Sequence, residues 1–381
     1  MSTKQNNVIY DVVIVGAGAS GVMCAIRASQ RGKKVLLIDG DLYPAKKLMV
    51  TGNGKCNLTN INMASKYFNQ NIDDYLSRFD ERRTLSFFND LGLVTYTDEE
   101  GRVYPYSRTA KSVIDILNNK LQKNQIEFKM SEVVEDINKC HDHYVILTSK
   151  SEYLSKSVVL STGSFVESNI ISKFDIALKT FNPSLCALKC ESFKRLSGVR
   201  LSDVEVTAIC NGKSKTDRGE VLFKDEGLSG IVIFNLSSLF ARAGIYKGKI
   251  IINLMPDFSR EEIVKMLHSR MGENDIFKGW FHDEVASIIL KKSGVLKINK
   301  TNINKIADAI IHLEFSIDGY YPNNQVHSGG VLLSSLTNNL ESKEYEGLYF
   351  CGEIVDVDGK CGGYNLQWAW TSGAIVGDSV C

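Results

Sequence analysis

Three glycines near the N-terminus are the residues whose spacing most clearly predicts chemistry. Gly16, Gly18 and Gly21 follow the apolar run VVIV and precede a helical pattern that reaches about Arg31. In such a strand–turn–helix unit the first glycine permits a tight turn. The second lets the backbone approach a pyrophosphate, and the third lets the helix pack on the strand. The start of the helix then offers free N–H groups and the positive end of its dipole to the phosphates.

A carboxylate completes this pattern. A second apolar run, Val35 to Ile38, ends in Asp39, eighteen positions after Gly21. An acid at this place hydrogen-bonds the ribose hydroxyls of the adenosine half of a dinucleotide. Because strand, glycines, helix, second strand and acid all have the required spacings, the sequence predicts a dinucleotide-binding unit rather than a chance glycine turn.

A long polar segment, residues 40–60, follows this unit without helical or strand periodicity. Most connections are short, so a polar loop of this length beside a nucleotide-binding unit is a candidate binding loop. Lys46 and Lys47 could meet phosphates, and Gly52 and Gly54 could let the backbone close over a flat ring. A solvated loop is the alternative on composition alone.

The C-terminal stretch, residues 347–377, carries a second signal. A buried strand, Leu348 to Cys351, stops at Gly352, and after a glycine-rich loop Gly363 introduces a helix that begins near Asn365. The first turn of this helix contains no acidic residue, so the positive end of its dipole is uncompensated. That suits a flavin, because the reduced ring carries negative charge at N1 and the C2 carbonyl.

Composition excludes several classes of function. The chain has 381 residues, 44% hydrophobic and 23% charged, with a formal net charge of +1. Near-zero charge argues against a nucleic-acid or anionic-membrane partner, and no apolar stretch is long enough to cross a bilayer. Nine scattered cysteines without a C-x-x-C pair indicate free thiols in a reducing, cytoplasmic compartment, and no dithiol relay. There is no second G-x-G-x-x-G, so an NAD(P)H donor would bind transiently over the flavin or be absent.

Five strings carry a family resemblance: VIVGAGASG, KKLMVTGNGKCNLTN, LSGVRLSDVEV, RGEVLFKDEGLSG and GLYFCGEIVDVDGKCGGYNLQWAW. With these strings the chain resembles the HI0933-like, or YhiN/BaiN-like, family of bacterial NAD(P)/FAD-dependent oxidoreductases. Some members are described as aminoacetone oxidases, and others as reductases of unsaturated 3-oxo bile acids. The resemblance spans nearly the whole chain and implies non-covalent FAD bound in an extended pose.

The resemblance also implies which residues contact FAD. By position these are Gly16, Ala17, Gly18, Ser20 and Gly21 at the pyrophosphate, Asp39 at the ribose, Lys47, Gly54, Lys55, Cys56 and Asn57 in the loop near the flavin, the backbone of Val133 at the adenine, Thr162 and Gly163 at a strand end, and Gly352, Glu353, Gly363, Asn365 and Leu366 in the C-terminal segment. The segment after Gly163, residues 164–180, is shorter than in the family and lacks its glycines, which bears on the substrate side of the site. The family more often has Glu at position 39 and Thr or Tyr at position 361.

Few residues are candidates for acid–base or redox roles. His327, just before a Ser-Gly-Gly turn, is a weak candidate for an acid or base, with a structural role as the alternative. Cys361 and Cys56 could be redox or flavin-attaching cysteines, but a buried thiol is the favoured alternative. No metal site is expected. The group Cys140, His141 and His143 falls on a hairpin tip, and the stretch from residue 356 lacks the glutamate that closes a calcium loop.

These patterns predict an α/β fold with a Rossmann-like FAD-binding domain of the glutathione-reductase type. This domain is expected to be discontinuous, residues 1–181 and 318–381. Residues 182–317 would form an inserted β-barrel-like domain with a small helical cap, and the substrate would bind where the two meet, over the flavin.

The expected function is that of an FAD-dependent oxidoreductase transferring hydride between the flavin and a small organic substrate. An NAD(P)H-driven reductase is slightly favoured over an oxygen-using amine or aminoketone oxidase. A non-catalytic or RNA-associated flavoprotein is the alternative from another class. The expected partner is a small molecule, with no nucleic acid, membrane or metal, and the sequence carries no signal for an oligomeric state.

Overall fold

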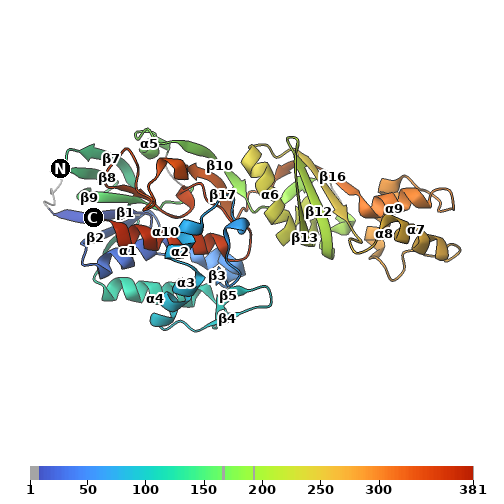
Figure 1. The fold of residues 1–381 in the computed structure, drawn as a ribbon, viewed down its shortest axis with the longest axis horizontal. Coiled ribbons are helices and arrows are strands. Elements are labelled where there is room, and N and C mark those ends of the chain that lie inside the picture. Colours follow the sequence, from blue (N-terminus) through green and yellow to red (C-terminus); the bar gives the residue numbers. More distant parts are fainter. Residues whose placement is uncertain (1–7, 165–167, 192–193, 381) are drawn as a thin grey trace. The chain divides into compact units, whose positions relative to one another are not determined.

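The computed structural model describes residues 8–164, 168–191 and 194–380. Part of the shortened segment after Gly163, residues 165–167, therefore lies outside the described residues. The chain divides into two compact units, residues 1–181 with 328–381 and residues 182–327 (Figure 1). Each unit has a hydrophobic core of its own.

A mostly parallel sheet forms the centre of the first unit. Its strands are, in spatial order, β6 (Glu127–Met130), β2 (Val35–Asp39), β1 (Ile9–Val15), β9 (Glu152–Leu160), β8 (His143–Thr148) and β7 (Val134–Cys140), with β18 (Leu348–Phe350) also paired to β9. The pairs β1–β2, β1–β9, β2–β6 and β9–β18 are parallel, whereas β7 and β8 pair antiparallel. The central strands are buried on both faces, which explains their continuous apolar runs. The predicted α/β class is confirmed.

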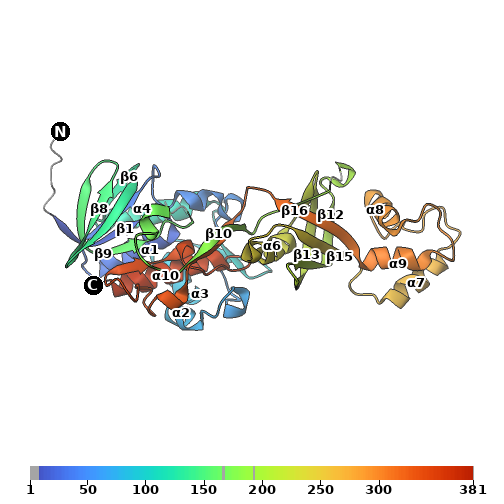
Figure 2. The same ribbon diagram turned by 90° about the horizontal axis from the view of Figure 1, so that it is seen from above.

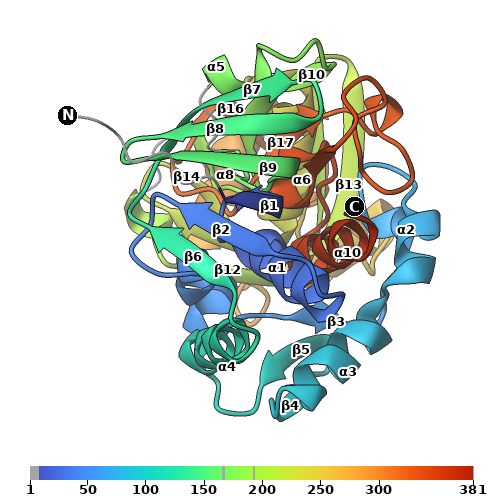
Figure 3. The same ribbon diagram turned by 90° about the vertical axis from the view of Figure 1, so that its left-hand side faces the viewer.

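Two helices from opposite ends of the chain pack against each other on this sheet. They are α1 (Ala19–Gln30) and α10 (Tyr364–Ser379), which lie side by side in Figure 3. Small residues permit the close approach. A Cβ atom on Gly373 would lie 2.4 Å from the Ser20 carbonyl oxygen, and one on Gly377 would lie 2.6 Å from that of Cys24. The C-terminal helix is therefore built into the nucleotide-binding unit.

The rest of the first unit consists of short strands and helical elements. It comprises η1 (Lys46–Gly54), β3 (Thr59–Asn60), η2 (Ser65–Tyr67), α2 (Asp73–Arg78), α3 (Glu81–Asp90), β4 (Thr95–Thr97), β5 (Arg102–Pro105), α4 (Ala110–Lys123), α5 (Ser168–Ile171), η4 (Leu333–Ser335) and η5 (Gly352–Ile354). The helical spacing of residues 72–91 predicts continuous helix, but the structure breaks it at Phe79. Asp80 ends the continuity because its side chain caps α3, accepting from Arg83 N at 2.9 Å.

The second unit is a closed barrel with helices. Its strands are β11 (Leu188–Cys190), β14 (Gly227–Ser229), β13 (Lys213–Lys224), β12 (Arg200–Cys210), β15 (Gly248–Asn253) and β16 (Leu313–Tyr320). Its helical elements are η3 (Lys194–Leu196), α6 (Ile231–Ala243), α7 (Arg260–Ser269), α8 (Asp283–Ser293) and α9 (Ile303–Ile311), of which α7, α8 and α9 gather together (Figure 2). Asn-Gly between two strand patterns predicts a tight hairpin turn, and Asn211 and Gly212 both have positive φ, 49° and 73°.

The return of the chain to the first unit lies later than expected. Residue 318 was the predicted boundary, but β16 continues as a barrel strand to Tyr320, which pairs with Leu188 of β11. The alternation of buried and exposed residues along β16 runs unbroken through position 318, so the barrel keeps this strand. The second unit ends at His327.

The chain enters the second unit through β10 (Leu178–Ser184) and leaves it through β17 (Val326–Val331). These two strands pair with each other.

Candidate functional site

The glycine turn after β1 separates into two packed positions and one open position. Gly16 has φ +102°, and a Cβ atom there would lie 2.6 Å from the Ser161 carbonyl oxygen. A Cβ atom on Gly21 would lie 1.9 Å from the carbonyl oxygen of Gly16, so this glycine lets α1 pack on the turn. Gly18 has nothing within 4 Å of its Cβ position. Open space therefore adjoins the backbone at the start of α1.

The start of α1 is not capped by a side chain of its own. Gly18 is the N-cap residue and provides no side-chain cap, and the first turn contains no acidic residue. The first N–H groups and the dipole are therefore suited to a phosphate. Asp39 has a role that the sequence did not reveal. Its Oδ2 accepts from Ala17 N at 2.5 Å and its Oδ1 from Asp41 N at 2.7 Å, so it also ties the turn to the end of β2.

Three parallel strands end beside this turn. Ser161, just after β9, donates to the carbonyl oxygens of Val15 at 2.9 Å and Gly16 at 2.6 Å. Beyond β18, a Cβ atom on Gly352 would lie 2.3 Å from Ser20 Oγ. The carboxyl ends of β1, β9 and β18 therefore meet at the start of α1, which is where open α/β sheets bind ligands.

A second group of predicted residues meets at the end of β9. A Cβ atom on Gly163 would lie 3.2 Å from Glu353 Oε2 and 3.6 Å from Lys47 Nζ. These residues come from three separate segments of the chain. Thr162 Oγ1 is buried and has no hydrogen-bond partner among the described residues. A buried hydroxyl without a partner fits a position that a ligand would satisfy.

The loop around η1 has an unusual concentration of left-handed backbone. Ala45, Asn53 and Cys56 have φ values of 60°, 54° and 58°, and Gly52 and Gly54 are also positive. Non-glycine residues adopt this region at a cost, and such outliers gather at ligand-binding loops. Gly54 and its neighbour Lys55 are exposed, whereas Cys56 is buried.

Asn57 and Asn365, both predicted near the flavin, hold backbone in the structure. With its amide oriented to satisfy its neighbours, Asn57 accepts from Gly363 N at 3.0 Å and donates to Thr59 O at 2.9 Å. The side chain of Asn365 accepts from the N–H of Gly359 and donates to the carbonyl oxygen of Gly359, both at 2.9 Å. These side chains shape the two loops that meet at the start of α10.

The start of α10 resembles that of α1. Its N-cap residue, Gly363, has φ +99° and no side-chain cap, and its first turn contains no acid. The helix begins at Tyr364, one residue before the predicted start. Leu366 is partly buried and packs against the hydrophobic core of the first unit.

Two tryptophans of α10 position the loops, a role that sequence reasoning missed. Trp370 Nε1 donates to Leu58 O at 3.0 Å, and Trp368 Nε1 donates to Gly352 O at 3.1 Å. Both side chains are buried. The available signal was the presence of two of the chain's three tryptophans on the helix that the glycine pair Gly362 and Gly363 introduces.

Val133 lies beside the end of β2. Its Cγ2 is 3.3 Å from the Cβ position of Gly40, and the residue is 46% exposed. Its N–H donates to Ser149 Oγ at 3.2 Å, and its carbonyl oxygen accepts from Ser149 N at 2.8 Å. The backbone of Val133, which was expected to meet the adenine, is therefore already hydrogen-bonded to Ser149 in the structure.

The two loop cysteines are thiols rather than thiolates. Burial raises the pKa of Cys56 to about 12, and it also raises the pKa of Cys361 to about 12. Because the thiolate is the reactive form, neither is activated as a nucleophile at neutral pH.

The remaining candidates are His327 and the group around Cys140. His327 is the last residue of the second unit, and its imidazole nitrogens lie 3.3 Å from Asn324 Nδ2. Cys140 pairs with His143 at the tip of the β7–β8 hairpin. Over the described ranges, no group of three or more His, Cys, Asp or Glu residues is placed to hold a metal ion. No helix within those ranges combines the length and apolar character needed to cross a membrane.

The residues of the first unit fit a dinucleotide with a flavin. Open space borders Gly18, two helix starts lack an acid in the first turn, and Thr162 has a buried hydroxyl without a partner within the described structure. These features come from the segments that the sequence singled out.

Comparisons with known proteins cover almost the whole chain. The family model described as HI0933-like protein Rossmann domain matches residues 10–379. A Clostridium scindens protein named 3-dehydro-bile acid delta(4,6)-reductase is 29% identical, over 96% of this chain and 97% of that protein. A Haemophilus influenzae protein named Ribosomal RNA dihydrouridine synthase is 26% identical, over 94% of this chain and 96% of that protein.

A solved structure shows the same fold at low identity. The 3-ketosteroid-delta4-(5alpha)-dehydrogenase from Rhodococcus jostii RHA1 is 14% identical, covers 99% of this chain and 98% of that chain, and has a TM-score of 0.50. The match of the family model to nearly every residue is the stronger finding. The chain belongs to the HI0933-like family of FAD-dependent oxidoreductases, and FAD is its cofactor.

Proposed function

We propose that this chain is an NAD(P)H-dependent reductase that saturates a carbon–carbon double bond conjugated to a carbonyl group. The observation that carries the proposal is the full-length similarity to relatives with two different names. One is named a delta(4,6)-reductase of a 3-dehydro bile acid, and the others are named dihydrouridine synthases. Both names describe the saturation of a ring double bond conjugated to a carbonyl.

The residues of the first unit would divide the work of binding. In this proposal the backbone at Gly18 and the start of α1 bind the pyrophosphate, and Asp39 binds the adenosine ribose. Lys47 and Glu353 border the flavin end, together with Gly163. Bound FAD supplies the hydride chemistry.

The start of α10 would favour the reduced state of the cofactor. Its dipole is not offset by an acid in the first turn, so it would stabilise negative charge nearby. Asn57, Trp368 and Trp370 hold the loops around it through backbone hydrogen bonds. With the pKa values of Cys56 and Cys361 raised to about 12, these loop thiols would act as packing groups and not as a redox relay.

The oxidative half-reaction tests this proposal. The FAD-loaded enzyme is reduced without oxygen and mixed with a 4-ene-3-oxo steroid. We expect the flavin absorbance to return and the product to gain two hydrogen atoms by mass. Return of the absorbance with oxygen but not with the steroid or with a uridine oligonucleotide would overturn the proposal. Reduction of the oxidised enzyme by an aminoketone, with release of hydrogen peroxide, would instead establish the oxidase alternative.

Uracil in RNA is a second candidate substrate. Relatives from Haemophilus influenzae and Escherichia coli, each 26% identical, are named Ribosomal RNA dihydrouridine synthase. The uracil ring also carries a double bond conjugated to a carbonyl, so the same chemistry would serve. Mass spectrometry of nucleosides from ribosomal RNA, with and without the gene, tests this candidate. Equal dihydrouridine in both samples would exclude it.

A further inference from the structure

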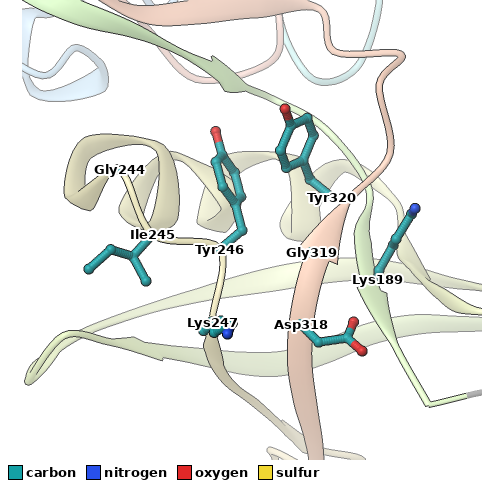
Figure 4. A pocket seen from close by; sticks show the side chains of 8 residues that line it. All are labelled: Lys189, Gly244, Ile245, Tyr246, Lys247, Asp318, Gly319 and Tyr320. Carbon is teal, nitrogen blue, oxygen red and sulfur yellow. The ribbon is translucent and has the colours of Figure 1, made fainter.

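The second unit contains a pocket that is lined entirely by its own residues. Its volume is about 460 Å³, within the range of small-ligand sites. It lies between the end of α6, the start of β15, β11 and the end of β16. The side chains that line it include those of Lys189, Ile245, Tyr246, Lys247, Asp318 and Tyr320 (Figure 4).

Two tyrosines form a preordered aromatic wall. The ring centroids of Tyr246 and Tyr320 are 4.2 Å apart, with an interplanar angle of 42°. Figure 4 shows the two rings side by side, with their hydroxyl groups pointing the same way. The Tyr246 hydroxyl donates to the carbonyl oxygen of Pro183, which fixes that ring. Aromatic rings held in this way offer a surface on which a nucleobase can stack at little entropic cost.

Cations flank this aromatic wall. Lys189 and Lys247 are both exposed and both line the pocket. The Lys189 ammonium lies 5.6 Å from the ring centroid of Tyr321, and the Lys224 ammonium lies 4.6 Å from the same centroid. Basic and aromatic side chains therefore lie close together on this part of the barrel. The sequence hides this grouping because its members come from separate strands and turns.

We propose that this pocket binds a nucleotide. The base would stack on the tyrosine wall, and the phosphate would lie between the ammonium groups of Lys189 and Lys247. The Asp318 carboxylate would accept a hydrogen bond from a ribose hydroxyl or a base N–H. A simple anion would leave the aromatic wall unused, and a neutral aromatic molecule would leave the lysines unused. A free nucleotide and a nucleotide unit of an RNA strand present the same chemistry to this pocket.

Calorimetric titration of the full-length protein, saturated with FAD, tests the proposal. The probes are UMP, uridine and hexauridylate, which avoid the adenine site of the cofactor. We expect UMP to bind more tightly than uridine. The double variant Lys189→Gln/Lys247→Gln and the single variant Tyr320→Leu should each weaken UMP binding about tenfold. The matched control is Lys297→Gln/Lys300→Gln, two exposed lysines of the same unit outside the pocket.

The controls separate binding from folding. Each variant should keep the flavin absorbance and melting temperature of the parent protein. Tighter binding of hexauridylate than of UMP supports an RNA strand as the source, and equal binding supports a free nucleotide. Failure of both UMP and hexauridylate to bind would overturn the proposal, as would equal UMP affinity in the pocket and control variants. Because no turnover is measured, this result is independent of the proposed reductase activity.

Discussion

At the residue scale, an added methyl group should lower protein stability at one glycine of the motif, Gly21, and FAD affinity at another, Gly18. In Gly21→Ala the new Cβ atom would lie 1.9 Å from a carbonyl oxygen, so overpacking should destabilise the apoprotein by at least about 1–3 kcal/mol. In Gly18→Ala the Cβ atom would meet nothing within 4 Å of the apoprotein. It would instead occupy space proposed for the pyrophosphate. We expect normal apoprotein stability and FAD affinity lowered about tenfold, or 1.4 kcal/mol.

Chemical unfolding of the apoproteins and titration with FAD measure these two effects separately. The glycines act as controls for each other, because they are three residues apart in the same turn. Equal destabilisation by both substitutions, or unchanged FAD affinity in Gly18→Ala, would contradict the assignment of the turn.

A buried thiol should make the free energy of unfolding fall as the pH rises above 9. The pKa of Cys56 is raised from 9.0 to about 12 by burial, so the unfolded chain loses this proton at lower pH than the folded chain. Stability is therefore complete below pH 9 and falls between pH 9 and 12, by about 1.4 kcal/mol per pH unit for one thiol. We expect Cys56→Ala to show a shallower fall in unfolding free energy over this window.

The quantity to compare is the slope of the unfolding free energy against pH, and not its absolute value. Cys140→Ala is the matched control, because Cys140 lies at a hairpin tip and is only partly buried. If Cys56→Ala and the parent protein lose stability with the same slope, the assignment of a buried protonated thiol is wrong.

At the scale of elements, α10 holds the loop that follows η1. Trp370 Nε1 donates to Leu58 O, and its ring packs edge-on against Phe88 with centroids 5.1 Å apart. Trp370→Phe leaves this buried carbonyl without its donor, which should cost about 1–3 kcal/mol. We also expect faster loss of FAD, because the loop contributes to the proposed flavin end.

Stopped-flow or dilution measurements of flavin release test this link. Trp280→Phe is the matched control, since Trp280 is a partly buried tryptophan of the second unit that packs on Phe281. Unchanged release in Trp370→Phe would mean that the loop does not retain the cofactor.

At the scale of the whole molecule, the two hydrophobic cores should unfold separately. A ligand stabilises only the unit that binds it, by RT ln(1 + [L]/Kd). FAD at about one hundred times its Kd should therefore stabilise the first unit by about 2.7 kcal/mol and leave the second unchanged. Differential scanning calorimetry should show two transitions, of which only one shifts with FAD. A single transition that moves as a whole would contradict this division.

Local patterns predicted much of the fold. The glycine turn, the Asn211–Gly212 hairpin and the start of α10 depend on residues adjacent in sequence, so their types and spacing suffice. The break between α2 and α3 was missed because apolar spacing persists across Asp80, whose capping side chain ends the helix.

Contacts between distant segments could not be predicted from one sequence. The hydrogen bonds between Asn57 and Gly363 and between Trp370 and Leu58 join residues about three hundred positions apart. The pocket at Tyr246 likewise assembles only when the barrel closes. Such sites depend on strand pairing and helix packing, which leave no periodic pattern in the residues themselves.

The most direct test of the central claim is an anaerobic titration of the purified protein with NADPH and NADH, following the visible flavin band. A reductase with bound FAD should show rapid bleaching by at least one of the two. A protein that binds FAD and bleaches with dithionite, but with neither nucleotide, would contradict the reductase proposal. A colourless protein that takes up no added FAD would contradict the whole assignment of the site.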